Sequence, residues 1–189
     1  TCTDNLAANG ADGTTRTATV KTTNNANADI DGVATYGGTA YTYTGVTATS
    51  MIPSTYATGA TPANVVFTQT LDTALSATNK IVITTTGTEI FAGNGATTCA
   101  VVQGSSTVAQ TSSIVASGVL TIIVNGGVTT SSAFTVTCTD NLAANGADGT
   151  TRTATVKTTL STDVEIDGVA TYAGAAYTYV GVTATSMIP

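Results

Sequence analysis

Residues 137–159 read TCTDNLAANGADGTTRTATVKTT, and residues 1–23 read the same, letter for letter. The match continues with few changes to Pro53 and Pro189, at a constant offset of 137 − 1 = 136 residues. A fixed period is the sequence signature of repeat architectures, and a period this long is the size of a whole domain. We therefore expect residues 1–53 to be the C-terminal part of a preceding repeat and residues 54–189 to be one full repeat.

The first residues of the chain correspond to the middle of a strand pattern in the second copy, where a natural domain seldom starts. Two explanations fit. Either the sequence is cut from a longer repeating chain, or residues 1–53 are completed by a neighbouring subunit, as in strand-exchange filaments. Both explanations imply head-to-tail assembly.

Apolar and polar residues alternate in several segments, which is typical of half-buried β-strands. Phe134, Val136 and Cys138 share one face of a predicted strand over 133–139. Ala154 and Val156 share one face of another over 151–158. Further strand candidates are 65–71, 80–86, 97–103, 120–124, 164–172 and 177–183. Asn-Gly and Asp-Gly turn signals separate them, so the sequence predicts an all-β, antiparallel β-sandwich.

The composition argues against several classes of protein. There is no His, so Ser-His and Cys-His catalytic systems cannot form. The five basic residues are scattered, whereas a nucleic-acid binder needs clustered cations. No segment reaches the roughly 18–20 apolar residues of a membrane-spanning helix. We expect no enzyme activity, no cofactor, no nucleic-acid partner and no membrane span.

Two groups of oxygen-bearing side chains are candidate sites. The pairs Asp29/Asp31 and Glu165/Asp167 stand at i, i+2 on one face of a strand and could in principle act as acid and base. A solvated strand end explains them better. The loop 140–149 is rich in oxygen ligands but lacks the spacing and closing Glu of a calcium loop, so a pair of turns is preferred to Ca²⁺ binding.

The three cysteines follow the repeat. Cys2 is the counterpart of Cys138, so each period carries two, and the natural bridge is Cys99–Cys138. Cys138 lies on an apolar face, as a core-spanning disulfide requires. Cys2 would pair with a cysteine of an upstream repeat or a neighbouring subunit. Such a bridge indicates an oxidising compartment, although a Cys2–Cys99 pairing and buried free thiols remain alternatives.

The many threonines suit an exposed β face. In a secreted protein, dense hydroxyls are also acceptors for O-glycans, while the sequence holds no Asn-x-Ser/Thr site for N-glycans. Flat Thr arrays can also bind ice, but here they are scattered and lack a short period. The O-glycosylation candidates are Thr135, Thr137, Thr151, Thr153 and Thr155.

Tyrosines recur near the end of each copy. They would either pack at the end of the sandwich or anchor contacts between domains or subunits, where amphipathic rings are favoured. The interface candidates are Tyr36, Tyr41, Tyr43, Tyr172, Tyr177 and Tyr179.

Three stretches carry a resemblance: ANVVFTQTLDTALSATNKIVITTT at 63–86, GVLTIIVNGG at 118–127 and TATVKTT at 153–159. They resemble repetitive immunoglobulin-like surface proteins of microalgae and other protists, some of which build extracellular fibres or flagellar hairs. The chain departs from them by lacking prolines in the loop before Asn79. The resemblance implies an immunoglobulin-like sandwich, no catalytic residues, and a glycosylated structural role.

The combined expectation is a structural subunit of an extracellular, O-glycosylated filament or cell-surface fibre. Its repeats would assemble head to tail, so the partner is the protein itself, as a homopolymer or as concatenated repeats. An adhesin stalk or S-layer-like surface module is the alternative, and an ice-binding protein is a remote one.

Overall fold

The computed structural model describes residues 15–16, 18–35, 41–42, 45–87, 90–130, 132–172, 177–178 and 181. Within these residues the chain is all-β, without a helix, and its sheets are antiparallel, consistent with a β-sandwich. The strands are β1 (Thr15–Arg16), β2 (Thr19–Thr23), β3 (Asp29–Thr35), β4 (Tyr41–Thr42), β5 (Thr47–Pro53), β6 (Val65–Thr70), β7 (Lys80–Gly87), β8 (Gly95–Ala96), β9 (Cys99–Gln103), β10 (Ser106–Val108), β11 (Gln110–Ala116), β12 (Val119–Val124), β13 (Phe134–Cys138), β14 (Thr151–Thr159), β15 (Glu165–Thr171) and β16 (Tyr177–Thr178).

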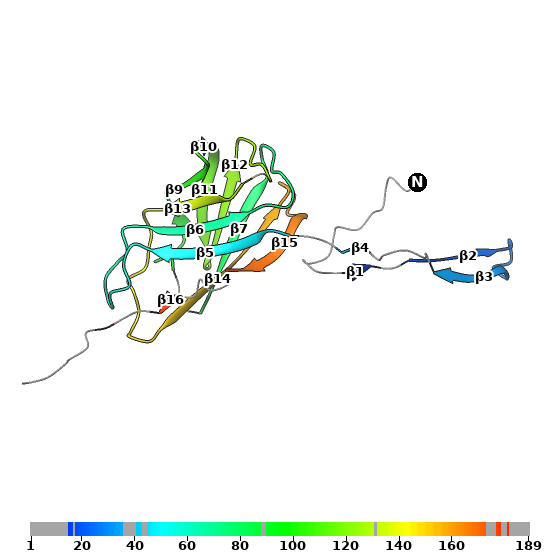
Figure 1. Cartoon of the computed structure of the whole chain (residues 1–189), viewed down its shortest axis with the longest axis horizontal. Coiled ribbons are helices and arrows are strands. Elements are labelled where there is room, and N and C mark those ends of the chain that lie inside the picture. The colour runs from blue at the N-terminus through cyan, green and yellow to red at the C-terminus, as the bar shows by residue number, and fades with distance from the viewer. Residues whose placement is uncertain are drawn as a thin grey trace, which may run out of the picture.

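Two large sheets form the sandwich (Figure 1). One has the strand order β10-β9-β13-β6-β5, and the other has the order β15-β14-β7-β12-β11-β8, with β16 also paired to β14. Buried and partly exposed residues alternate strictly along β6, β12 and β13. The buried apolar side chains of both sheets therefore meet in a single core cluster. Burial of each large apolar side chain stabilises the fold by about 1.5–3 kcal/mol.

Strand β5 is the first strand of this sandwich. Just before it, Gly45 forms a parallel bridge with Gly168 of β15, and β5 then pairs with β6 in the other sheet. Ala48, Met51 and Pro53 of β5 are buried, so the strand belongs to the core. The predicted division between residues 53 and 54 stays a prediction, and it runs between the paired strands β5 and β6.

The first four strands lie outside both large sheets, and Figure 1 shows them apart from the sandwich. Strand β2 pairs with β3, with Thr19 opposite Thr35 and Val20 opposite Ala34. The second copy of the sequence has the same register, 136 residues later, between β14 and β15. Strands β1 and β4 likewise repeat the pairing of β14 with β16. The two copies of the sequence therefore form the same local hairpin in two different surroundings.

Candidate interaction surface

The β2–β3 hairpin exposes apolar side chains that its counterpart buries. Val20 is 46% exposed and Ile30 is 66% exposed. Their counterparts in the sandwich are Val156, which is 1% exposed, and Ile166, which packs against the core. Since residues 15–23 and 151–159 are identical, the surroundings alone produce this difference.

Among the residues that the structure describes, one edge of the hairpin has no neighbouring strand. In the sandwich, β14 lies between β15 and β7, and Val156 stands opposite Ile83 of β7. Strand β2 pairs only with β3, so its other edge has no strand beside it among the described residues. Such an edge presents a row of backbone donors and acceptors and is a template for a further strand. This edge and the exposed apolar face together form the candidate interaction surface.

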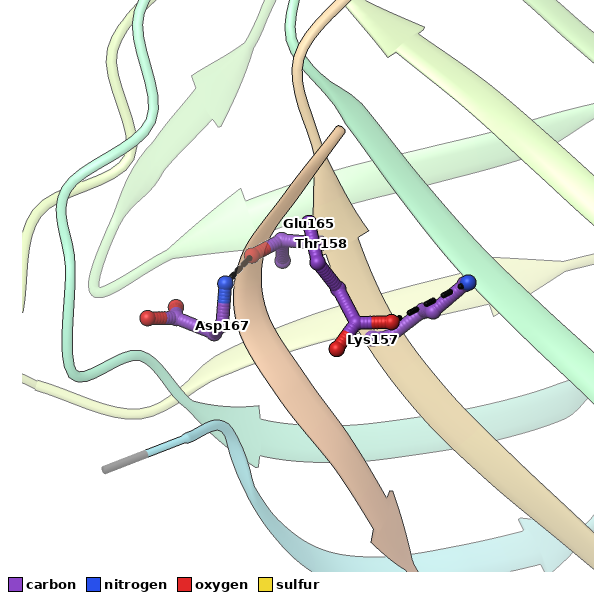
Figure 2. Close-up of polar contacts among 4 residues, drawn as sticks. All are labelled: Lys157, Thr158, Glu165 and Asp167. Atoms are coloured by element: carbon purple, nitrogen blue, oxygen red, sulfur yellow. Dashed lines mark hydrogen bonds and ion pairs between the residues drawn. The ribbon is translucent and has the colours of Figure 1, made fainter. Parts of the chain in front are cut away.

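The carboxylates of Glu165 and Asp167 do not meet as an acid–base pair, and the preferred prediction of a solvated strand end is wrong for Asp167, which is buried. Glu165 accepts a bond from Lys157 Nζ at 3.3 Å, while the backbone N–H of Asp167 donates to Thr158 Oγ1 at 3.1 Å. Figure 2 shows the two carboxylates extending away from each other on β15. The pairing of β14 with β15 shifts register on both sides of Thr158, and this irregularity breaks the alternation that would place both acids on one face.

The side chain of Asp167 is buried, and neither of its carboxylate oxygens has a hydrogen-bond partner of normal geometry among the described residues. Burial raises the pKa of Asp167 above its ordinary value, and the nearby Thr73 and Thr158 offset this only in part. In the exposed copy, Asp31 instead accepts a hydrogen bond from Thr22 Oγ1. We therefore interpret Asp167 as a carboxylate that loses its hydration when β15 packs into the sandwich, and not as an acid–base site.

Replacing this buried carboxylate should stabilise the fold. A pKa raised by folding means that the folded state binds the proton more tightly, so stability is complete at low pH and falls as pH rises through the folded pKa. We expect Asp167→Asn to stabilise the protein at about pH 7 by on the order of 1 kcal/mol, with the gain vanishing in acid. Thermal unfolding across pH measures this. Asp31→Asn is the matched control and should change nothing; a loss at neutral pH in Asp167→Asn would refute the prediction.

Cys99 and Cys138 form a disulfide, which is the pairing expected from the repeat. Both side chains are buried. The bridge does not span the core, contrary to the expectation. Cys99 and Cys138 stand opposite each other on the neighbouring strands β9 and β13 of one sheet. Cys2 lies outside the described residues.

Two polar side chains of the oxygen-rich loop 140–149, Asp140 and Asn145, form hydrogen bonds with other parts of the sandwich. The carboxylate of Asp140 accepts bonds from the hydroxyls of Thr97 and Thr98, both at 2.7 Å, and from the Thr98 backbone N–H. Asn145 is buried and donates Nδ2 to the carbonyls of Thr55 and Ala57 at 3.0 and 2.9 Å. These bonds tie the loop to the sandwich.

Asp140 should make stability depend on pH in the opposite sense to Asp167. The bonds from Thr98, and then from Thr97, lower the pKa of Asp140. A lowered pKa contributes stability above the unfolded-state value, and this contribution is lost as pH falls through the folded pKa. We expect Asp140→Asn to lower Tm at about pH 7 and to match the unmodified chain in strong acid. Tm values that differ equally at every pH would contradict this.

The tyrosines predicted as interface anchors have different positions. Tyr172 is buried, donates its hydroxyl to Gln69 Oε1 at 2.7 Å, and packs with its ring 5.6 Å from that of Phe67. It is therefore a core residue in this chain, and burial raises the pKa of its hydroxyl. Tyr41 and Tyr177 lie at equivalent places in β4 and β16. The remaining candidates, Tyr36, Tyr43 and Tyr179, lie outside the described residues.

The threonine candidates lie on outer faces of the sandwich. Thr151 is exposed, and the others, which alternate with buried residues, are partly exposed: Thr135, Thr137, Thr153 and Thr155. This arrangement agrees with the predicted alternation along β13 and β14.

Comparisons with protein-family models, curated proteins and solved structures gave no match to this chain. Across the described ranges, no three His, Cys, Asp or Glu side chains are grouped as a metal site would require. No helix long and apolar enough to cross a membrane occurs in the same part of the chain. The feature of the described residues that points most directly to a function is the interaction surface on the β2–β3 hairpin.

Proposed function

We propose that this chain is a non-catalytic structural module of an extracellular filament or cell-surface fibre, in which immunoglobulin-like β-sandwich repeats follow one another head to tail. The observation that carries the proposal is the hairpin that β14 forms with β15. The same hairpin occurs a second time along the chain, as β2 with β3, in the same strand register. A unit that recurs in sequence and in local structure is suited to stacking beside itself. The Cys99–Cys138 disulfide is compatible with a secreted protein.

The surface supports the same proposal. Only 8% of residues are charged. The polar groups on the outer faces of the two sheets are therefore mostly hydroxyls rather than charges. Partly exposed threonines on β13 and β14 would carry O-glycans that solubilise these faces. Repeating sandwiches then give length, the disulfide gives resistance to unfolding, and the sugar coat keeps neighbouring fibres apart.

Electron microscopy of the purified material tests the assembled form. Regular helical fibres are the expected result. Flexible strings of beads would indicate the adhesin-stalk alternative, extended two-dimensional sheets would indicate an S-layer, and dispersed single particles at all concentrations would refute a fibre built from this chain alone.

Mass measurement of peptides from the natively secreted protein tests the glycans. We expect peptides that carry the candidate threonines to exceed their polypeptide masses by whole sugar residues, whatever the length of the secreted chain. Peptide mapping should then place sugars on Thr151 and on the partly exposed threonines of β13 and β14. An unmodified mass would rule out the glycosylated part of the proposal.

A further inference from the structure

The β2–β3 hairpin and its counterpart in the sandwich differ in burial over one whole face. Val20, Thr22 and Asp31 are all exposed. The equivalent residues Val156, Thr158 and Asp167 are between 0% and 1% exposed. We propose that the β2–β3 hairpin closes a second sandwich in the way that β14 and β15 close the first, and that its partner is an unclosed copy of residues 45–136, the segment that forms β5 to β12 and the first part of β13.

The docked geometry follows from the second copy. In the sandwich, β14 adds to β7 with Val156 opposite Ile83 and Thr158 opposite Ile81. With the same register, β2 adds to a copy of β7 so that Val20 stands opposite Ile83. Main-chain hydrogen bonds along the open edge of β2 then supply affinity, and alternate side chains enter the core, as in strand addition to a sheet edge. Val20 then becomes buried like Val156, and Ile30 becomes partly buried like Ile166.

The partner has to be unclosed. In an intact copy, β14 already occupies the place beside β7. Residues 15–23 and 151–159 are identical, so an exchange between two intact molecules would bury one face and release an equal one. No net apolar surface is gained, and apolar burial drives such association. The inference concerns this surface and its partner, and it holds whether or not the protein forms fibres.

The test is a protein in which a second copy of residues 45–136 is joined directly before Thr1 of the full chain. Because residue 136 normally precedes the sequence repeated from Thr1, the join restores the natural order of strands. Hydrogen exchange is followed in peptides that include residues 24–29, which differ between the copies and so identify β2–β3. We expect exchange in these peptides to slow by on the order of 100-fold or more relative to the unmodified chain. Unchanged exchange would overturn the proposal.

Thiol counting gives a second readout. By sequence, Cys2 is the counterpart of Cys138, so the added copy of Cys99 should pair with it. The joined protein should then have no thiol to alkylate after unfolding without reductant. A persistent pair of alkylatable thiols would show that the added strands and the hairpin do not form the second sandwich.

Two variants separate docking from nonspecific effects. Val20→Asp in the joined protein should restore fast exchange in β2–β3 while leaving the original sandwich intact, and Ile83→Asp in the added copy alone should do the same. If β2–β3 stays protected in both variants, the proposed register is refuted. In the unmodified chain, hydrogen exchange in β2–β3 should be equally fast at all protein concentrations. Protection of β2–β3 that rises with concentration would show that intact molecules are the partner, and it would overturn the choice of an unclosed copy.

Discussion

Val156→Asp should unfold the sandwich, whereas Val20→Asp, the same substitution at the equivalent position, should leave stability unchanged. Val156 is 1% exposed within the core, so an ionised carboxylate there is buried without a partner, at a cost of about 4 kcal/mol or more. Val20 is 46% exposed, and a surface substitution of this kind changes stability by no more than about 0.5 kcal/mol. Urea unfolding of the two variants and the unmodified chain measures both effects.

The comparison is internally matched, because the residues around the two valines are identical from 15 to 23 and from 151 to 159. Helix or strand propensity therefore cannot explain a difference between the variants. Equal destabilisation by both substitutions would mean that β2 is buried in solution as deeply as β14. Equal tolerance would mean that β14 does not enter the core. Either outcome would contradict the fold described for this chain.

Much of the fold was predictable from alternation alone. The pattern of Phe134, Val136 and Cys138 correctly identified the buried face of β13, and Ala154 and Val156 that of β14. These predictions succeed because the side-chain period of a strand is two, so one buried face imposes a visible pattern on the sequence. Strand order within each sheet depends on which edges meet and was not accessible from the pattern.

The errors arise where tertiary context decides. Alternation placed Glu165 and Asp167 on one face, but the irregular pairing around Thr158 turns them apart. Cys138 was assigned correctly to an apolar face, yet that face is compatible with a partner across the core or beside it, and only the pairing of β9 with β13 selects the latter. For Tyr172 the sequence left packing in the sandwich and an interface both open, and its contact with Gln69, which is distant in sequence, decides for the core.

The interaction surface itself could not be predicted from residue types. Val20 and Val156 have the same neighbours along the chain, and no property of the sequence marks one as exposed and the other as buried. The useful signal was the repeat, because it matched residues 1–53 to residues 137–189. It did not show that β5 pairs with β6.

Removing the Cys99–Cys138 disulfide should produce the other large loss of stability. The bridge joins residues 39 apart in sequence, and in the chain-entropy account a closed loop of that length restricts the unfolded chain by about 4 kcal/mol. Cys99→Ala combined with Cys138→Ala should therefore lower the free energy of unfolding by about that amount. The variant is made in a Cys2→Ala background, so that no third thiol can form a new bridge, and Cys2→Ala alone is the reference.

The slope of the unfolding free energy against urea distinguishes the mechanism. If the disulfide acts on the unfolded chain, its removal lets that chain expand, and the slope should increase because more surface is exposed on unfolding. If the bridge acts mainly by holding β9 against β13 in the native sheet, the slope stays constant and hydrogen exchange rises in those two strands alone. A loss below about 1 kcal/mol with neither change would refute a stabilising role for the bridge. The sandwich would then depend on its apolar core alone, and closure by β14 and β15 would matter more for stability than the covalent link.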